Sequence, residues 1–506
     1  MKKGMARTAI ALACLLVFSV ATHAQTEAQA NSQWTPLENY ITSEMHDWKV
    51  PGLAVGIVRG NDVYVKGFGV RNIKTGQPVT PNTLFDIGSC TKAFTAAAVG
   101  ILVDEGKMRW DGRVDEYIPF FHLYDPLADE NVTMRDLLTH RTGLGGTDLL
   151  WYGTSLPLEQ IIRRVRYIKP EAGFRAKFQY QNVMYATAGY AVGEASEGTW
   201  QQFVREQILT PLGMTGADFS ATDAQKAPDY ATPHDERDGK VVTIPWRNID
   251  NVAPAGSINA GVGDMTKWIA MQLNDGMANG KQIVSAQSMK EMHTPQIVVP
   301  PGGEFELFFP KALQLSYGMG WFIQDYGGHQ ILLHPGDIDG FASLVVLIPE
   351  VHTGFVILTN LDHTPVREGL GYHLIDEFLK LPAQDWTTYF AKVGERFSAM
   401  GQKAEEAAAT PQHPDTHPSR ELAAYAGRYR NKAYGDVVIS LEGDELQMQF
   451  NSFTGVLEHF QYDTFVANLG GFGKSRVTFN LDGNGDVTEL RTEGLKFERV
   501  SETGRQ

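Results

Sequence analysis

The chain has 506 residues, of which 43% are hydrophobic and 20% are charged, and its formal net charge is −15. This length is too great for one ordinary hydrophobic core, so two or three domains are expected, and the composition excludes a disordered or fibrous chain. The negative charge opposes binding to nucleic acid phosphates and to anionic membranes, so we expect neither as a partner.

The first residues predict a signal peptide, residues 1–24. Three positive charges within the first seven residues precede an apolar run, 8–20, and a small-residue exit, 22–24. Loss of this segment would leave a net charge of −18 and Cys90 as the one cysteine, so no intramolecular disulfide is expected. No later stretch is apolar enough to insert into a membrane, and we expect a periplasmic or secreted protein. Cys14 leaves lipid attachment open, although the apolar run continues well past it.

Residues 34–381 are expected to form one mixed α/β domain. The expected strands are two within residues 50–70, around a turn at 60–62, and then 319–324, 330–333, 341–348 and 354–359. The expected helices are one that begins after Ser89 and stops at Gly106, a short one that a Thr133–Asp136 capping box opens, and 158–167, 183–195, 201–209 and 365–379. Because strands lie at both ends with helices between them, we expect the terminal strands to share one sheet flanked by helices.

The composition changes after Leu381. Residues 382–418, which include the proline-rich segment PQHPDTHPS, are expected to be a linker. Beyond it, residues 419–501 alternate as strands do, with Leu446, Met448 and Phe450 on one face. Short strands separated by turns predict a small antiparallel β-barrel or sandwich.

Two patterns suggest metal binding only weakly, so we expect neither a metal site nor a cofactor. His413 and His417 lie four apart, but the prolines around them oppose the helix that this spacing requires. A loop that starts at Asp482 has Glu493 at the twelfth position of a calcium loop, but Val487 occupies the sixth, where a glycine is required. The alternating apolar residues on both sides favour a hairpin turn there.

The segment FDIGSCTKAF places Ser89 three residues before Lys92 at the start of an alanine-rich helix. Residues three apart share a helical face, so the amine can lie beside the hydroxyl and help to remove its proton once its pKa is lowered. The helix amino end offers N–H groups for an oxyanion. Alone, this spacing is equally typical of a capping serine with a solvated lysine. We expect Cys90 to be a small buried thiol rather than a nucleophile.

Two further motifs change this interpretation. With Ser-Cys-Thr-Lys at 89–92, Tyr-Gln-Asn at 180–182 and His-Pro-Gly at 334–336, the chain resembles the serine β-lactamase and penicillin-binding superfamily. It is similar to the class C-like branch that contains D-aminopeptidases, D-alanyl-D-alanine carboxypeptidases and family VIII esterases. The flanking stretches VPGLAVGIV, TMRDLLTHRTGL and GFASLVVLIP match as well. The resemblance covers residues 37–379 and implies a β-lactamase-like fold.

The resemblance also implies roles for single residues. Ser89 would be the nucleophile, Lys92 its proton-handling neighbour, and Tyr180 the phenol or phenolate that passes a proton to the leaving group. The implied substrate-binding residues are Asn182, His334, Gly336 and Asp337. Asn182 would orient the lysine and donate to the substrate carbonyl, and the backbone N–H groups of Ser89 and Asp337 would form the oxyanion hole.

From the residues alone, purely structural interpretations of these residues stay open. Tyr180 could be a core aromatic residue, and His334 could form a hydrogen bond at a strand end. We expect His140 to hold a loop. Pro335 lacks an N–H, so strand pairing around it is expected to differ from the usual pattern.

The third motif bears on the substrate. Class C β-lactamases carry a lysine where this chain has His334, and a histidine is mostly neutral at pH 7, so capture of a substrate carboxylate should be weak. The leading interpretation is an exported serine hydrolase that forms an acyl-enzyme on Ser89 with peptides or amides, including D-residue or peptidoglycan-derived ones, or with short esters. The alternatives are a penicillin-binding sensor with little turnover and a class C-like β-lactamase. The C-terminal barrel resembles the small lipocalin-like domain of some relatives and would shape access to the site or assist assembly, and the oligomeric state stays open.

Overall fold

A computed structural model describes residues 33–300, 305, 308–408, 412–413, 415–470 and 473–501. The expected signal peptide lies outside the described residues. Residues 33–47 are helical and belong to a compact unit that ends at Val50, and a second unit begins at Pro51. Of the helices in the described ranges, none has both the length and the apolar content that a bilayer crossing requires.

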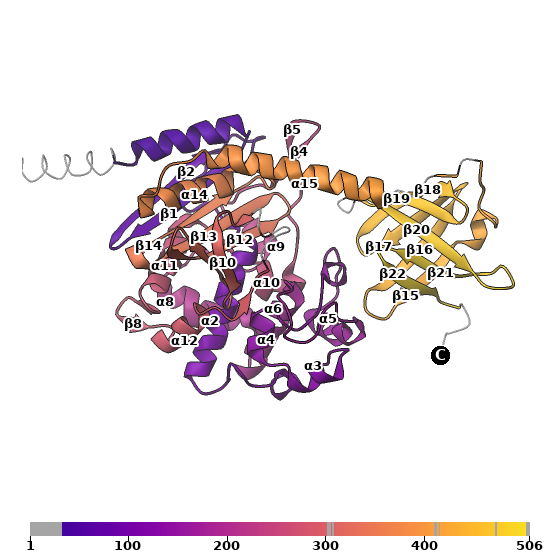
Figure 1. Ribbon diagram of the computed structural model, residues 1–506, viewed down its shortest axis with the longest axis horizontal. Coiled ribbons are helices and arrows are strands. Elements are labelled where there is room, and N and C mark those ends of the chain that lie inside the picture. The colour runs from indigo at the N-terminus through magenta and orange to yellow at the C-terminus, as the bar shows by residue number, and fades with distance from the viewer. Residues whose placement is uncertain are drawn as a thin grey trace, which may run out of the picture. The chain divides into compact units, whose positions relative to one another are not determined.

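The second unit is built on an eight-stranded antiparallel sheet in the order β2-β1-β14-β13-β12-β11-β10-β9 (Figure 1). Its strands are β1 (Gly52–Arg59), β2 (Asp62–Gly69), β9 (Ile297–Val298), β10 (Ala312–Tyr317), β11 (Phe322–Tyr326), β12 (His329–Ile338), β13 (Phe341–Ile348) and β14 (Thr353–Thr359). The first and last strands, β1 and β14, pair in register from Leu53↔Thr359 to Arg59↔Thr353. The expectation that the terminal strands share one sheet is therefore confirmed.

Helices cover both faces of this sheet. A β-carbon added to Gly371 of α14 (Val366–Leu379) would lie 2.5 Å from Leu344 and 4.0 Å from Ile357. A β-carbon added to Gly354 would lie 2.7 Å from Ile269 of α11 (Val262–Leu273). Because residues 354 and 357 point to opposite faces of β14, α14 and α11 lie on opposite sides of the sheet.

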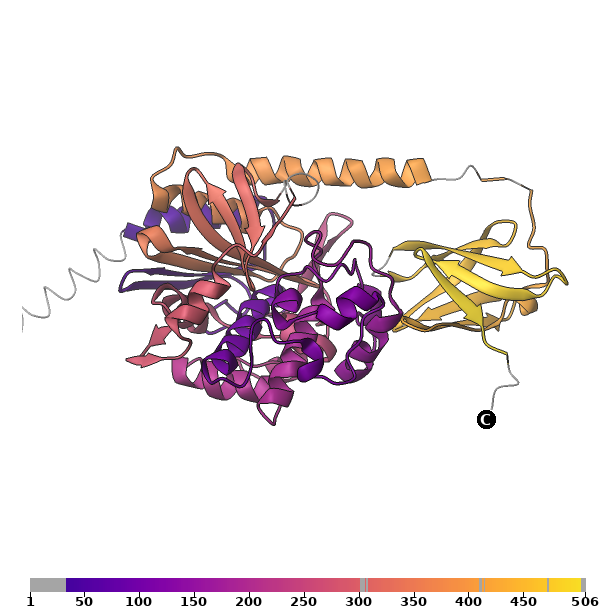
Figure 2. The same cartoon turned by 60° about the horizontal axis from the view of Figure 1, so that its bottom comes forward.

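A further group of helices forms a second layer (Figure 2). In the sequence, these helices lie between β2 and β10. They are α2 (Thr91–Asp104), α3 (Pro126–Asn131), α4 (Met134–Leu138), α5 (Leu158–Arg164), α6 (Asn182–Ala195), α7 (Trp200–Val204), α8 (Thr210–Leu212), α9 (Ala221–Ala224), α10 (Ala253–Gly256) and α12 (Ala286–Met292). Short two-stranded sheets pair β3 (Phe85–Asp86) with β6 (Asn259–Ala260), β4 (His234–Arg237) with β5 (Lys240–Thr243), and β7 (Met277–Ala278) with β8 (Lys281–Gln282). The expected capping box at Thr133 and Asp136 opens α4.

One predicted strand begins later than expected. Residues 319–321 precede β11 because Gly320 adopts φ +81° in the turn from β10, where a β-carbon would lie 2.6 Å from the Cα of Ala93. This conformation is favourable only for glycine, and it brings the turn against the start of α2.

The segment 382–418, expected to be a linker, contains the 23-residue helix α15 (Trp386–Ala408). Its start is fixed to the preceding domain because the buried carboxylate of Asp376 accepts hydrogen bonds from the Trp386 indole and the Tyr326 hydroxyl, each at 2.6 Å. Tertiary contact therefore supports a helix that composition alone did not suggest.

The C-terminal part is a closed eight-stranded antiparallel barrel, which confirms the predicted small β domain. Its strands are β15 (Gly427–Asn431), β16 (Gly435–Glu442), β17 (Glu445–Phe450), β18 (Phe453–Gln461), β19 (Thr464–Asn468), β20 (Lys474–Leu481), β21 (Val487–Thr492) and β22 (Leu495–Arg499). Strands β20 and β21 pair as a hairpin around the turn at Asp482, as its sequence pattern favoured over a calcium loop.

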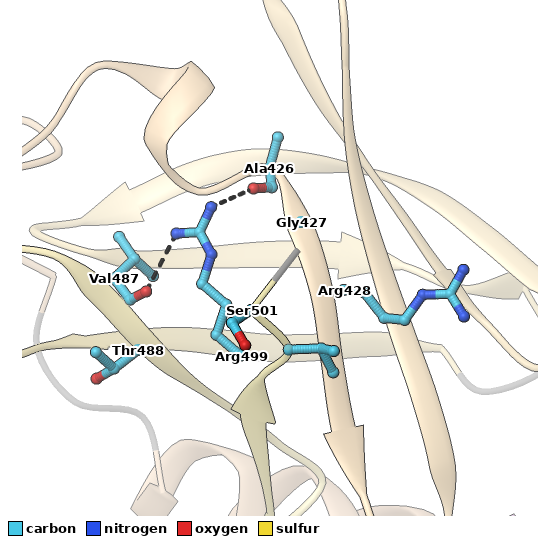
Figure 3. Close-up of a pocket in the computed structure, with 8 residues that line it drawn as sticks. Ala426, Gly427, Arg428, Val487, Thr488, Arg499 and Ser501 are labelled. Atoms are coloured by element: carbon cyan, nitrogen blue, oxygen red, sulfur yellow. Dashed lines mark hydrogen bonds between the residues drawn. The ribbon is translucent and has the colours of Figure 1, made fainter. Parts of the chain in front are cut away.

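The Arg499 side chain lies where the first and last strands of the barrel meet. The Arg499 guanidinium donates hydrogen bonds to the carbonyls of Ala424, Ala426 and Val487 at 2.6–3.1 Å, in a cavity of about 670 Å³ (Figure 3). Three backbone acceptors occupy the guanidinium, so it serves to join segments of the barrel.

Candidate active site

Ser89 lies in a tight turn that the chain makes directly before α2. Gly88 adopts φ +49°, and its N–H donates to the Asp86 carboxyl at 2.8 Å. A β-carbon added to Gly88 would lie 2.8 Å from the backbone nitrogen of Asp337 on β12. Glycine at this position therefore allows the serine turn and the third motif to approach each other.

Lys92 is one helical turn beyond Ser89, and its side chain is fully buried. Its Nζ lies 2.8 Å from each of three acceptors: the Ser89 hydroxyl, the Asn182 side-chain oxygen and the Ala255 carbonyl. None of the three is charged. Burial lowers the pKa of Lys92 to about 7, against the weaker opposing effect of the Asp148 charge. Near neutral pH, a large fraction of the lysine can therefore act as a base towards Ser89.

Tyr180 lies two residues before the start of α6 and lines the same cavity as Ser89. Its ring centroid is 4.7 Å from the Lys92 Nζ, and its hydroxyl shares a hydrogen bond with the Ser89 side chain. Desolvation raises the pKa of Tyr180 well above 10 despite that hydrogen bond. The structure therefore favours the phenol over the phenolate, which the sequence left open.

Both the oxygen and the nitrogen of the Asn182 side-chain amide form hydrogen bonds. The oxygen accepts from Lys92, and the nitrogen donates to the Asp148 carboxylate at 3.1 Å. Asp148 also accepts from the Trp151 indole at 2.8 Å and lines the cavity. One hydrogen of the Asn182 amide nitrogen is left to face a substrate. Sequence reasoning missed Asp148, because an aspartate in a loop rich in glycine and threonine is an ordinary turn residue.

Buried His334 lies in β12 with both ring nitrogens engaged. Nδ1 lies 2.6 Å from the Pro335 carbonyl, which can only accept, so Nδ1 carries the proton and Nε2 accepts from the Tyr317 hydroxyl at 3.0 Å. Burial lowers the pKa of His334 to about 3, and the Lys92 charge acts in the same direction. The imidazole is therefore neutral and offers no cation to a substrate carboxylate.

Gly336 and Asp337 lie on a part of β12 that has one free edge. β12 pairs with β11 only as far as Leu333, whereas its pairing with β13 continues to Ile338 without a shift in register. Pairing with β13 is therefore regular across Pro335, whereas pairing with β11 ends two residues before it. Backbone nitrogens two residues apart face the same edge, so the missing N–H of Pro335 and the N–H of Asp337 both belong to the edge beside Ser89. A β-carbon at Gly336 would lie 2.1 Å from the Ile87 carbonyl oxygen, so this close approach requires glycine.

The cavity in front of Ser89 has a volume of about 510 Å³. The described residues that line it are Ser89, Asp148, Tyr180, Asn182, Phe305, Phe308, Phe309, Phe322, His334, Pro335, Asp337 and Arg367. Of the seven residues expected to form the site, Lys92 and Gly336 lie behind this lining, and the other five form part of it. Cys90 is buried beside the His334 carbonyl, and burial raises the pKa of its thiol to about 12.

His140 holds the segment that carries Tyr180. It has φ +57°, and its Nδ1 accepts from the Gln181 N–H at 2.9 Å while its carbonyl accepts from the Gln179 N–H at 2.8 Å. The ring centroids of His140 and Tyr180 are 4.4 Å apart. Tyr180 is therefore positioned by contacts on both sides of it in the chain.

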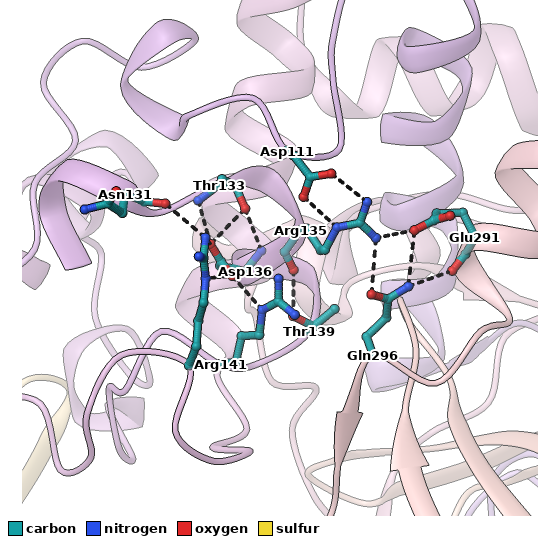
Figure 4. A network of polar contacts seen from close by, with 10 residues as sticks. Asp111, Asn131, Thr133, Arg135, Asp136, Thr139, Arg141, Glu291 and Gln296 are labelled. Carbon is teal, nitrogen blue, oxygen red and sulfur yellow. Dashed lines mark hydrogen bonds and ion pairs between the residues drawn. The ribbon is translucent and has the colours of Figure 1, made fainter. Parts of the chain in front are cut away.

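A polar network fixes the loop that contains His140 (Figure 4). The fully buried Asp136 carboxylate accepts from Arg141 at 2.5 Å and from Arg175 at 2.7 Å, in addition to capping α4 with Thr133. The Arg175 N–H donates in turn to the Arg141 carbonyl. Asp136 thus joins the His140 loop to the segment that leads into the Tyr180 motif.

Comparisons with known proteins agree on the family. A family model for β-lactamase matches residues 37–380, and a model for a domain of unknown function, DUF3471, matches residues 411–503. Unguisins hydrolase ungD of Aspergillus violaceofuscus is 28% identical over 88% of this chain and 85% of its own length. Unguisins hydrolase ungD' of Aspergillus campestris is 30% identical over 79% of this chain and 76% of its own length.

A solved structure supports the fold. The octameric penicillin-binding protein homologue from Pyrococcus abyssi superposes with a TM-score of 0.62 at 24% identity, covering 92% of this chain and 99% of its own. Protein flp of Staphylococcus aureus strain COL is 24% identical over 66% of this chain and 64% of its own length.

We expect Asp136→Asn to destabilise the protein by about 3 kcal/mol, because it removes a buried charge and leaves two guanidinium groups without their partner. Denaturant unfolding followed by tryptophan fluorescence would measure the loss. Asp111→Asn is the matched control, because Asp111 forms an ion pair with Arg135 from a side chain that is 69% exposed, and such pairs contribute about 1 kcal/mol or less. Equal losses in the two variants would contradict the structural role of Asp136.

Proposed function

This chain belongs to the β-lactamase family and is a serine hydrolase of that type, and we propose that it cleaves peptides or amides, or short esters, through an acyl-enzyme on Ser89. The observation that carries the proposal is the buried Lys92 amine at 2.8 Å from the Ser89 hydroxyl, with a pKa near 7. A lysine with only a structural role is not expected in this position, because burial of an ammonium group without a charged partner is unfavourable.

Each group at the site has a step that it can perform. Neutral Lys92 accepts the Ser89 proton as the oxygen bonds to the substrate carbonyl carbon, and the Ser89 and Asp337 N–H groups stabilise the negative oxygen. Lys92 then returns the proton through the Tyr180 phenol to the leaving group as its bond to carbon breaks. Water attacks the acyl-enzyme by the reverse sequence, and Ser89 recovers its proton.

Two relatives that match most of this chain bear on the choice between an enzyme and a sensor. They are named as unguisins hydrolases, and hydrolysis by relatives of similar length favours an enzyme over a sensor that binds without turnover. The neutral His334 disfavours a class C-like β-lactamase, whose substrates present a carboxylate. We therefore place D-residue peptides and amides, peptidoglycan-derived ones among them, and short esters ahead of β-lactams.

Labelling with a fluorophosphonate and with a labelled penicillin, followed by intact-mass measurement, tests the acyl-enzyme. We expect one adduct per chain, absent in Ser89→Ala, and turnover of at least one substrate class in a screen of D-aminoacyl amides, D-Ala-D-Ala peptides, nitrocefin and p-nitrophenyl esters. A penicillin adduct that never clears, with no turnover, would favour the sensor. No adduct with either reagent would exclude both functions.

The pKa of Lys92 predicts the pH dependence of acylation. Because the lysine acts as a base only when deprotonated, kcat/KM for p-nitrophenyl acetate should rise about tenfold per pH unit below 7 and level off above it. Lys92→Arg, which stays protonated, should lose on the order of 10²-fold or more in rate over the whole range. The rates are measured from pH 5 to 9 after subtraction of the Ser89→Ala rate, and a flat profile would exclude Lys92 as the base.

We further propose that the protein is exported and begins near Gln25, on the strength of the leader-like pattern in residues 1–24. Expression of the full chain in a bacterium, followed by fractionation and intact-mass measurement, tests this. The expected product is a periplasmic or secreted protein without residues 1–24. A lipidated product that begins at Cys14, or an uncleaved cytoplasmic protein, would contradict it.

A further inference from the structure

One wall of the cavity in front of Ser89 is aromatic. The rings of Phe309 and Phe322 have centroids 4.7 Å apart, and that of Phe305 lies 5.8 Å from Phe322. All three line the cavity. Phe309 and Phe322 are only 4% and 2% exposed, so they form the packed base of this wall, and the half-buried Phe305 ring offers the surface that an apolar group can cover. A preformed surface of this kind gains free energy when an apolar group covers it.

The aromatic wall and Tyr180 both lie next to His334. The Phe322 ring is 5.4 Å from His334, and the His334 ring is 6.2 Å from Tyr180. In the proposed mechanism Tyr180 delivers the proton to the leaving group, so that group lies beside the phenol. The aromatic wall is therefore within reach of the leaving group.

The charges around the cavity disfavour an anion. Arg367 is the one cationic side chain among the described residues that line it, and it forms ion pairs with both Asp337 and Glu368. Among the described lining residues, one positive charge is thus opposed by two negative ones, Asp337 and Asp148, and Glu368 further offsets the charge of Arg367. His334 has both nitrogens engaged in hydrogen bonds and offers no charge. A leaving group with a free carboxylate would meet net repulsion.

We propose that Phe305, Phe309 and Phe322 form a leaving-group subsite for an uncharged residue with an aromatic or bulky apolar side chain. In a peptide this is the residue that follows the scissile bond, in a chain that continues beyond it or ends in an amide. The inference rests on the proposed acyl-enzyme mechanism. It specifies which substrates can form the acyl-enzyme. It disfavours removal of a C-terminal residue that bears its free carboxylate.

Acyl transfer tests the subsite directly, because an incoming amine occupies the place that the leaving group vacates. The enzyme is acylated with p-nitrophenyl acetate in the presence of phenylalaninamide, glycinamide or phenylalanine, with both enantiomers of the chiral acceptors. The acceptor nitrogen bonds to the acetyl carbon, the bond to Ser89 Oγ breaks, and Oγ regains a proton that the amine releases. The ratio of N-acetyl product to acetate, measured by mass spectrometry, reports binding of the acceptor.

For one enantiomer at least, we expect phenylalaninamide to exceed glycinamide by about tenfold in this ratio, since one buried apolar group gives discrimination of this order. Phenylalanine should fall below phenylalaninamide by about tenfold, because of the net negative charge. Phe309→Ala should remove the preference for phenylalaninamide, and Phe309→Leu should keep part of it. Phe120→Ala is the matched control, because Phe120 is a half-buried ring that packs on Tyr190 away from the cavity.

The ratio compares two fates of the same acyl-enzyme, so it does not depend on how much of a variant is folded. Equal ratios for phenylalaninamide and glycinamide, an equal ratio for phenylalanine, or no transfer to any acceptor in wild-type enzyme would overturn the subsite. No release of p-nitrophenol above the Ser89→Ala rate would instead contradict the acyl-enzyme itself, so the two failures are distinguishable.

Discussion

The burial of the Lys92 amine among uncharged acceptors is the constraint on which the site depends. A carboxylate in direct contact would keep the ammonium charged, and none makes that contact in the described part of the chain. Asp148, the carboxylate whose charge acts on Lys92, binds the Asn182 amide instead. The three acceptors come from the turn before α2, from α6 and from α10, so the packing of separate parts of the chain determines the pKa of one amine. Desolvation of a charge is expensive, and here it favours the form of lysine that can accept a proton.

The same burial acts on the amine and on the phenol with opposite results. The pKa of Lys92 falls to about 7 and that of Tyr180 rises, so near pH 7 the phenol is neutral and so is a large fraction of the amine. In that fraction the three groups that would exchange protons carry no charge. In the proposed mechanism, charge develops only when Ser89 attacks, at the place where the backbone N–H groups of the turn and of β12 can stabilise it. This arrangement needs no phenolate and no second cation to lower the pKa of the tyrosine.

Much of the fold could be predicted because the relevant signals are local. Alternation at Leu446, Met448 and Phe450 marks a barrel strand, and the capping box at Thr133 marks the start of α4, since each depends on residues a few positions apart. The closure of the barrel depends on pairing between β15 and β22, which are distant in the sequence, and the place of α15 depends on the tertiary contact of Trp386 with Asp376. No local pattern carries that information.

The catalytic motifs were visible in the sequence and their surroundings were not. The spacing of Ser89 and Lys92 follows from helical geometry, but the opposite pKa shifts require knowledge of what covers them. Asp148 gives no signal because its role depends on Asn182, 34 residues later. Phe309 belongs to a phenylalanine-rich run that has no periodicity, and its contact with Phe322 is tertiary.

The neutral histidine connects specificity with the state of the lysine. A cation at position 334 would bind a substrate carboxylate and would also repel a proton from Lys92, since the charges of these two side chains disfavour each other. With His334 neutral, the low pKa of Lys92 depends on exclusion of water. An apolar leaving group against Phe309 would exclude water further, whereas a charged one would bring its hydration shell into the cavity. Shape and desolvation can therefore discriminate between substrates and maintain the base at the same time.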